Sequence, residues 1–218
     1  MAQRDSGYER RERELYETPE WVTEAVLPHL RLLRTVLEPC VATGKMYRVL
    51  ARYAEEAIGS DIKPAQGFPV ADFLDVQQRP ITPITDIVSN PPYGEDGELA
   101  VQFIEHALNI TQDVRGQVAM LLRADFDHAS SRQHIFRSHP AFAKRIVLTK
   151  RIKWFEGPVT CKHCNGHGSV PRDDGLCLVK CKPCRGKGKK NQSPSENHCW
   201  FIWDWQTVGR HPQVAYAP

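Results

Sequence analysis

The stretch "TVLEPCVATGKMYRVL", residues 35–50, decides the fold class of this chain. Its first residues are apolar or β-branched, which is typical of a short buried strand, and that strand ends at Pro39. Gly44 then supplies a turn, and apolar residues recur at helical spacing over residues 44–56. A strand that passes through a glycine turn into a helix predicts an α/β unit.

The same alternation continues along the chain. We expect further helices over residues 16–33, 97–111 and 130–139. Thr18 is a suitable N-cap for the first of these helices, and Pro19 suits its first helical position. The further strands that we expect are 57–62, 86–89, 116–122, 144–155 and 198–205. This alternation predicts a doubly wound, mostly parallel α/β sheet, with the last two strands as an antiparallel hairpin at one edge.

The composition describes a soluble globular protein. The chain has 218 residues, of which 41% are hydrophobic and 25% are charged, enough for one α/β domain and a small appendage. No apolar run approaches the length of a membrane span, and the N-terminal sequence "MAQRDSGYERRERELY" lacks the apolar core of a secretory signal. We therefore expect a flexible arm over residues 1–15, no membrane partner and a cytoplasmic location.

Five of the seven cysteines lie between residues 161 and 184. Two copies of Cys-x-x-Cys-x-Gly-x-Gly occur there, "CKHCNGHG" at 161–168 and "CKPCRGKG" at 181–188. In a reducing compartment this clustering favours a metal over disulfides. Four thiolates are enough for one structural, tetrahedral Zn²⁺ with no open position for catalysis. The repeat resembles the zinc-binding repeat of DnaJ-type chaperones, and the expected ligands are Cys161, Cys164, Cys181 and Cys184.

Other histidines and cysteines leave alternative metal ligands open. His163 and His167 could replace a ligand, although the symmetry of the repeat favours four cysteines. Cys177 and Cys199 are left over, and we expect Cys40 to be a small packing residue rather than a nucleophile.

Residues 157–198 join the last two strands, and a connection of this length is far beyond an ordinary hairpin loop. We expect a zinc-binding insertion with its own structure. The segment carries a net charge of +5, whereas the whole chain carries +3, so its excess positive charge predicts contacts with nucleic-acid phosphates. The alternative is a solvated, charged loop. The expected phosphate contacts are Lys162, Arg172, Lys180, Lys182, Arg185, Lys187, Lys189 and Lys190.

Two strand ends carry unusual residues, "LEPCVATGK" at 37–45 and "NPPY" at 90–93. Ligands of open α/β sheets bind outside the carboxyl ends of the strands. Together, the two stretches resemble the S-adenosylmethionine-dependent N6-adenine DNA methyltransferases, above all the small versions carried by phages and prophages. The likeness extends from Tyr16 to Asp204, outside the insertion.

This resemblance implies a Rossmann-like class I methyltransferase fold over residues 16–156 and 199–218. It implies S-adenosylmethionine as cofactor, DNA as partner and a bacterial or phage-infected host cell. Asp61 would accept the ribose hydroxyls, Asp72 would meet the adenine amino group, and Phe73 would lie against the adenine ring. The residues implied for the cofactor are Tyr16, Thr18, Pro19, Glu38, Pro39, Cys40, Gly44, Asp61, Ile62, Asp72 and Phe73.

Ala42 is a departure from the family, which usually has glycine there. If the position needs a positive φ, alanine costs roughly 1 kcal/mol and weakens cofactor binding.

The tetrapeptide Asn90-Pro91-Pro92-Tyr93 is implied to be catalytic. The exocyclic amine of adenine is a poor nucleophile, because its lone pair is delocalised into the ring. The Asn90 side-chain oxygen and the Pro91 carbonyl can each accept one of its N–H bonds and aim the nitrogen at the methyl group. Pro92 restricts the backbone before it to an extended conformation. Tyr93 would stack on a base that has left the duplex.

Three other interpretations stay open. The same tetrapeptide occurs in enzymes that methylate amines in RNA or side-chain amides in proteins. The chain could also be a binding module whose cofactor turn is damaged at Ala42. Finally, each feature also has a purely structural interpretation when it is taken alone: the tetrapeptide could be a surface turn, Asp61 could be a helix or turn cap, and Phe73 could be a core residue.

Overall fold

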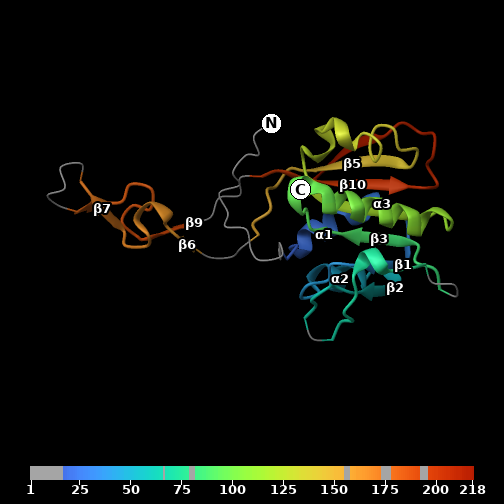
Figure 1. The fold of residues 1–218 in the computed structure, drawn as a ribbon, viewed down its shortest axis with the longest axis horizontal. Helices are drawn as coiled ribbons and strands as arrows, with labels where there is room; N and C mark the ends of the chain where they lie inside the picture. The colour runs from blue at the N-terminus through green and yellow to red at the C-terminus, as the bar shows by residue number, and fades with distance from the viewer. Residues whose placement is uncertain (1–16, 66, 79–81, 155–157, 173–177, 192–195) are drawn as a thin grey trace. The chain divides into compact units, whose positions relative to one another are not determined.

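The computed structural model describes residues 17–65, 67–78, 82–154, 158–172, 178–191 and 196–218 (Figure 1). The chain divides into two compact units, unit 1 with Met1–Ile152 and Glu196–Pro218, and unit 2 with Lys153–Ser195. The expected N-terminal arm and Tyr16 lie outside the described residues.

Unit 1 is built on a seven-stranded sheet with the order β11-β5-β10-β4-β3-β1-β2. Parallel pairs join β1 to β2 and β3, β3 to β4, and β5 to β11, whereas β10 is antiparallel to both of its neighbours. The doubly wound, mostly parallel sheet predicted from the sequence is therefore confirmed. The strands are β1 Leu33–Glu38, β2 Ala54–Gly59, β3 Asp86–Ser89, β4 Gln117–Arg123, β5 Phe142–Leu148, β10 His198–Asp204 and β11 Gln213–Ala217.

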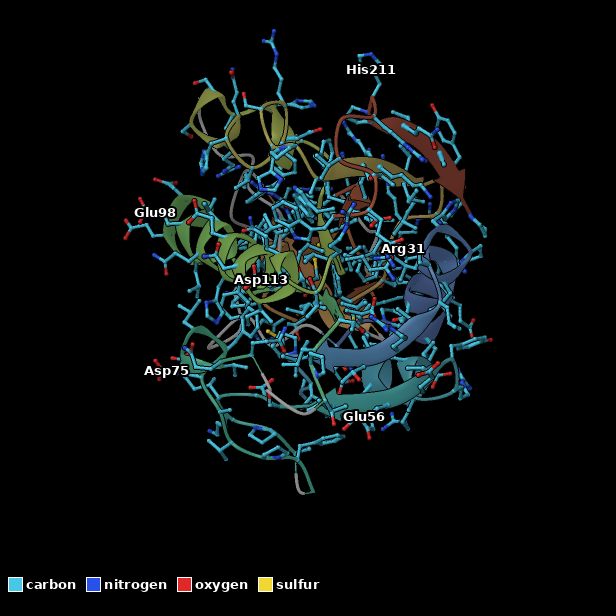
Figure 2. The ribbon with its side chains drawn as sticks, turned by 90° about the vertical axis from the view of Figure 1, so that its right-hand side faces the viewer. Arg31, Glu56, Asp75, Glu98, Asp113 and His211 are labelled. Carbon is cyan, nitrogen blue, oxygen red and sulfur yellow. The ribbon has the colours of Figure 1, made fainter. Side chains whose placement is uncertain are left out.

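Helices cover the sheet from both sides. Figure 2 shows α3, which carries Glu98, on one side of the sheet and α1 on the other. Alternate residues of β10 follow this division: Trp203 joins the core beneath α3, whereas the Trp200 indole donates to the Val22 carbonyl of α1. The helices are α1 Glu20–Val26, α2 Lys45–Leu50 and α3 Glu98–Gln112.

Short 3₁₀ turns complete the helical structure of the chain. None of the helices in the described ranges combines the length and the apolar character that a membrane span requires. The 3₁₀ turns are η2 Leu27–His29, η3 Phe73–Asp75, η4 Glu95–Gly97, η5 Phe126–His128, η6 Ser130–Arg132 and η7 Lys162–Cys164.

Three helix predictions need correction. The first α-helix starts at Glu20 and passes into a 3₁₀ turn after Val26; Pro19 is its N-cap, and no side chain, Thr18 included, makes a cap bond there. The second helix stops at Leu50, because residues 51–53 form a turn and the chain pairs with β1 as strand β2 from Ala54 onward. Over residues 130–139 the chain forms η6 and turns instead of a helix.

The antiparallel pair of β5 and β10 is present, but it does not form the sheet edge. Strand β10 lies inside the sheet between β4 and β5, and all its residues are buried. The edge beyond β5 is β11, a strand that the sequence patterns did not predict. Because β5 ends at Leu148, the predicted strand 144–155 is also too long at its C-terminal end.

Unit 2 contains two short antiparallel ribbons. Strand β6 Pro158–Thr160 pairs with β9 Lys189–Asn191, and β7 Ser169–Pro171 pairs with β8 Leu178–Lys180. The two Cys-x-x-Cys-x-Gly-x-Gly repeats lie at the ends of these strands. The ribbons are too short to enclose an apolar core of their own.

Candidate functional site

The turn between β1 and α2 contains two residues in the left-handed region. Ala42 has φ 46° and Gly44 has φ 84°. Ala42 therefore adopts the positive φ that glycine adopts more easily, and this conformation costs an alanine roughly 1 kcal/mol. Backbone bonds hold the turn against the end of β2, from Ser60 N–H to the Glu38 carbonyl and from Val41 N–H to the Ser60 carbonyl, each 3.0 Å long.

Asp61 fastens the same turn from the other side. One carboxylate oxygen accepts the Ala42 N–H at 3.0 Å, and the other accepts the Lys63 N–H at 2.8 Å. A carboxylate has about four acceptor positions, so these bonds leave capacity for further donors. The next residue, Ile62, leaves 63% of its surface exposed, which places an apolar side chain beside this carboxylate.

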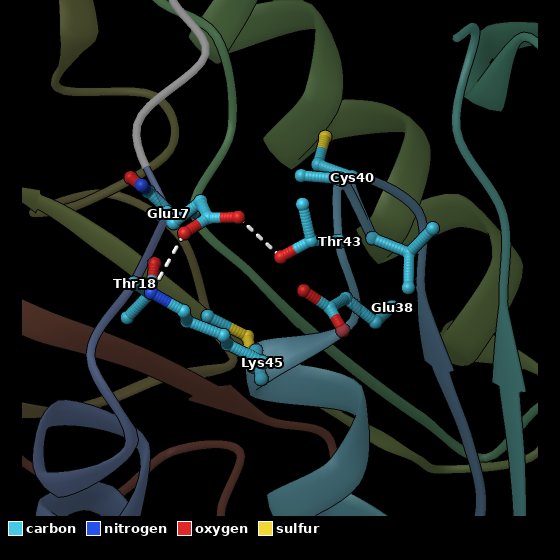
Figure 3. A pocket seen from close by; sticks show the side chains of 10 residues that line it. Glu17, Thr18, Glu38, Cys40, Thr43 and Lys45 are labelled. Atoms are coloured by element: carbon cyan, nitrogen blue, oxygen red, sulfur yellow. Dashed lines mark hydrogen bonds and ion pairs between the residues drawn. The ribbon is translucent and has the colours of Figure 1, made fainter. Parts of the chain in front are cut away.

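A small, partly open pocket lies beside this turn (Figure 3). It lies at the carboxyl ends of β1 and β3, where the strand order reverses, which is the usual ligand position in a doubly wound sheet. The pocket brings together the predicted residues Thr18, Glu38, Cys40 and Asn90. Its full lining is Glu17, Thr18, Glu38, Cys40, Val41, Ala42, Thr43, Lys45, Met46 and Asn90.

Glu38 is the most unusual group in the pocket wall. Its side chain is 3% exposed, and its Oε2 atom is buried without a hydrogen-bond partner among the described residues. Burial raises the pKa of Glu38 well above its ordinary value, the Tyr47 backbone N–H opposes this, and Asp61 adds to the rise. Burial also raises the pKa of Cys40 to about 12, so its thiol stays protonated and is a poor nucleophile.

The Asn90-Pro91-Pro92-Tyr93 segment follows β3 directly. Asn90 lines the pocket, Pro91 is buried, and Pro92 and Tyr93 are half-buried. The Tyr93 hydroxyl accepts the Arg123 N–H at 2.7 Å, and its carbonyl accepts the Leu99 N–H at 3.1 Å near the start of α3. These bonds hold the segment between β4 and α3.

Several residues predicted for the cofactor lie elsewhere. Pro19, Pro39, Gly44 and Asp61 are near the pocket but do not line it. Asp72 is exposed, and its carboxylate accepts the Leu74 N–H at 3.0 Å.

Phe73 is 2% exposed and packs against Phe103 and His106 in the core beneath α3. The structure thus places Phe73 in the core, and its expected position against an adenine ring stays a prediction.

The pocket also contains residues that the sequence patterns did not single out. The Lys45 ammonium lies 2.7 Å from Glu17 Oε2, and the Thr43 hydroxyl donates to Glu17 Oε1. The hydrogen bond from Lys45, followed by that from Thr43, lowers the pKa of Glu17. Glu17 directly precedes the predicted residue Thr18, and Lys45 directly follows the predicted residue Gly44. This adjacency was the only sequence signal that could have placed Glu17 and Lys45 in the pocket.

The four repeat cysteines of unit 2 converge on one point. Their sulfur atoms all lie within 4.8 Å of one another, and the Cys161–Cys181 and Cys164–Cys184 sulfurs are 3.7 Å apart. Thiolates about 2.3 Å from a central Zn²⁺ are about 3.8 Å apart in a regular tetrahedron, so the cluster fits one such ion. His163 and His167 are exposed and do not belong to it.

The two repeats form near-equivalent halves around this cluster. The Cys161 N–H donates to the Gly188 carbonyl at 2.8 Å, and the Cys181 N–H donates to the Gly168 carbonyl at 2.9 Å. The Gly168 N–H also points at the Cys164 sulfur, 3.2 Å away. A Cβ at Gly188 would lie 2.0 Å from the Gly166 carbonyl oxygen, so the close approach of the halves requires glycine.

The basic residues described in unit 2 lie at its surface. Seven of the eight residues expected to contact phosphates have exposed side chains. The side chain of the eighth, Lys190, is outside the part of the chain that the structure describes. The exposed residues are Lys162, Arg172, Lys180, Lys182, Arg185, Lys187 and Lys189.

No protein-family model matches the sequence, and no curated protein matches it. Among solved structures, the chain is similar to a provisionally named class I S-adenosylmethionine-dependent methyltransferase from Listeria monocytogenes, with 12% identity and a TM-score of 0.51. This match covers 90% of the present chain and 62% of the Listeria protein, so the chain spans less than two thirds of that protein.

Two further structures have lower scores. The 23S rRNA methyltransferase ErmE gives 15% identity and a TM-score of 0.47, over 90% of this chain and 72% of ErmE. A dimethyladenosine transferase from Plasmodium falciparum gives 14% identity and a TM-score of 0.45, over 87% of this chain and 62% of that protein. With the strand order and the Listeria match, the predicted class I methyltransferase fold is confirmed.

Replacing Gly44 should disturb the pocket more than replacing another left-handed glycine. A Cβ at Gly44 would lie 2.9 Å from the Phe68 ring, whereas a Cβ at Gly67, φ 97°, would meet nothing within 4 Å. We expect Gly67→Ala to cost about 1–2 kcal/mol of unfolding free energy from backbone strain alone. Gly44→Ala should cost more, because the ring must also move. Urea denaturation measures both, and equal losses would contradict the role of Phe68.

The purified chain should contain one zinc ion, measured by atomic emission. Cys181→Ser should lose it, because three thiolates no longer close the tetrahedron. Cys199→Ser is the matched control, since Cys199 is equally buried but lies in β10. Zinc that persists in Cys181→Ser, or disappears in Cys199→Ser, would show that the ion binds elsewhere.

Proposed function

We propose that this chain is an S-adenosylmethionine-dependent methyltransferase that methylates the N6 amine of adenine in DNA. The observation that carries the proposal is the shared pocket. Asn90, which follows β3, lines the same cavity as Glu38 and Ala42 of the β1–α2 turn. A methyl donor on the turn and an amine beside Asn90 would therefore be neighbours.

The pocket residues fit the methionine end of this cofactor. The cofactor carries an amino-acid group with both charges and supplies an electrophilic methyl group on a positively charged sulfur. The unpartnered Glu38 Oε2 atom in the pocket wall needs a cationic or hydrogen-donating partner. The exposed Ile62 and the Asp61 carboxylate would serve the adenine ring and the ribose.

The chain's own residues would orient the target amine. Asn90 Oδ1 and the Pro91 carbonyl would each accept an N–H bond, which keeps the lone pair of the nitrogen directed at the methyl carbon. The cofactor would supply the methyl carbon, whose bond to sulfur would break with its electron pair staying on sulfur as the nitrogen–carbon bond forms, and the extra N–H proton would pass to water. Holding both reactants in line can remove up to about 7–11 kcal/mol of barrier.

Tyr93 would provide the flat surface for the extruded base. Its ring packs edge-on against Phe126, with the centroids 5.8 Å apart, and the hydroxyl bond to Arg123 fixes its tilt. A ring held in this way loses little side-chain entropy when a base stacks on it.

The zinc-binding insertion, predicted over residues 157–198, would bind the nucleic acid. Its exposed lysines and arginines suit phosphate oxygens, which position a duplex without reading its bases. The zinc would be structural, because a cluster with four thiolates leaves no open coordination position.

Methyl transfer can be assigned by incubating the chain with cofactor carrying a labelled methyl group and unmodified DNA, RNA or protein. We expect label in N6-methyladenine of DNA. Asn90→Ala should reduce transfer at least about hundredfold, because the amine is no longer aligned, while calorimetry shows unchanged cofactor affinity. The control Gln206→Ala removes an exposed amide beyond β10 and should be fully active.

The other results overturn specific parts of this proposal. Label in RNA or in a protein amide would replace the substrate. Cofactor binding without transfer to any substrate would favour a binding module, and an active Asn90→Ala would remove the proposed role of that amide.

Charge removal in unit 2 should weaken DNA binding in a salt-dependent way. Lys182→Gln with Lys187→Gln should reduce the slope of log affinity against log salt by about 2, roughly one unit for each phosphate contact. Arg34→Gln with Arg210→Gln makes the same charge change on exposed residues of unit 1 and should leave the slope unchanged. Fluorescence anisotropy with a labelled duplex measures both, and equal slopes would contradict the role of unit 2.

A further inference from the structure

The pocket beside the β1–α2 turn carries charges of both signs. Glu17 supplies a carboxylate, and Lys45 is the one cation among the described residues that line the pocket. Glu38 adds a buried carboxyl group, which would become fully ionised once a cationic partner lies beside it. Figure 3 shows these three side chains around the opening, with Thr43 between Glu17 and Glu38. The positively charged Arg48 is nearby, but its guanidinium donates to the Thr43 carbonyl at 3.0 Å and does not line the pocket.

Glu17 holds the Lys45 side chain in place. One Glu17 oxygen lies 2.7 Å from the Lys45 ammonium, and the other accepts the Thr43 hydroxyl. An ammonium group has three N–H donors, so the bond to Glu17 leaves two for an anion. The Lys45 side chain is 45% exposed, which leaves it accessible to a ligand.

Helix stability does not explain a lysine at this position. Lys45 is the first residue of α2, where the helix dipole disfavours a positive charge. Its ion pair with Glu17 is partly exposed, and such pairs stabilise a fold by only about 0.2–1 kcal/mol. A role in binding an anion accounts for the cation better than a role in folding.

From these contacts we infer that Lys45 binds the α-carboxylate of the methionine end of the cofactor, with Glu17 as its positioning residue. The inference rests on the proposed function. Glu38, with its unpartnered Oε2 atom, takes the α-ammonium. The chain thus recognises both charges of an amino-acid group, and it selects against adenosyl compounds that lack the carboxylate.

Calorimetry on the full chain with four compounds tests this. S-adenosylmethionine and S-adenosylhomocysteine carry the carboxylate, whereas decarboxylated S-adenosylmethionine and methylthioadenosine do not. Lys45→Met should weaken S-adenosylmethionine binding at least about tenfold and change binding of the decarboxylated compound less than about twofold. Lys45→Arg should keep the preference for the carboxylate.

Two further variants separate the positioning role of Glu17 from a general effect of removing a surface charge. Glu17→Gln should reduce the preference for the carboxylate, and it should have no further effect when Lys45 is already methionine, because it acts through that lysine. Arg34→Met is the control, because Arg34 is an exposed cation of β1 that does not line the pocket. It should bind all the compounds as the native chain does.

The failures are distinguishable. If Lys45→Met weakens the decarboxylated compound as much as S-adenosylmethionine, or weakens neither, the assignment of Lys45 is wrong while the proposed cofactor stands. If the native chain binds none of the four compounds, the proposed function itself is wrong. Thermal unfolding of each variant separates a loss of binding from a loss of folding.

Discussion

The bond from the Ala42 N–H to the Asp61 carboxylate is the constraint on which the site depends. It joins the turn after β1 to the residues after β2, and it keeps the backbone at Ala42 in a conformation that alanine disfavours. Without this bend, the chain after Glu38 would continue past the end of the sheet. With it, Cys40 and Lys45 come back beside the residue that follows β3. The strain at one residue is thus the local cost of bringing two strand ends to one cavity.

The described residues of unit 2 lack the apolar core that stabilises unit 1. Its strands have only three residues each, and the buried side chains at its centre are cysteines. The glycines bring the two halves so close that a side chain at Gly188 would collide with the opposite backbone. Metal coordination would supply the stability that apolar burial supplies in unit 1, as it does for other small metal-binding segments.

The fold could be predicted from the sequence where buried strands and the long α3 helix carry strong periodic patterns. The failures arose where pairing between distant segments overrode local pattern. Residues 54–56 suit a helix, but β1 recruits them into β2. The candidate site was predictable as two motifs, and their meeting at the switch in strand order followed from topology. The contact between Glu17 and Lys45 could not be predicted, because it joins a residue that precedes α1 to the first residue of α2 and has no periodic signature.

The strands on either side of the insertion are hydrogen-bonded neighbours, with Val147 of β5 opposite Cys199 of β10. The pairing of β5 with β10 therefore fixes the distance between the two ends of the insertion, whatever the length or structure of the insertion. Loop-closure entropy grows only with the logarithm of length, by about 0.6 kcal/mol for each doubling. A segment of another length or chemistry could therefore replace the insertion between β5 and β10 without shifting the register of the sheet. Evolution could then exchange the segment between these two strands while leaving the seven-stranded sheet intact.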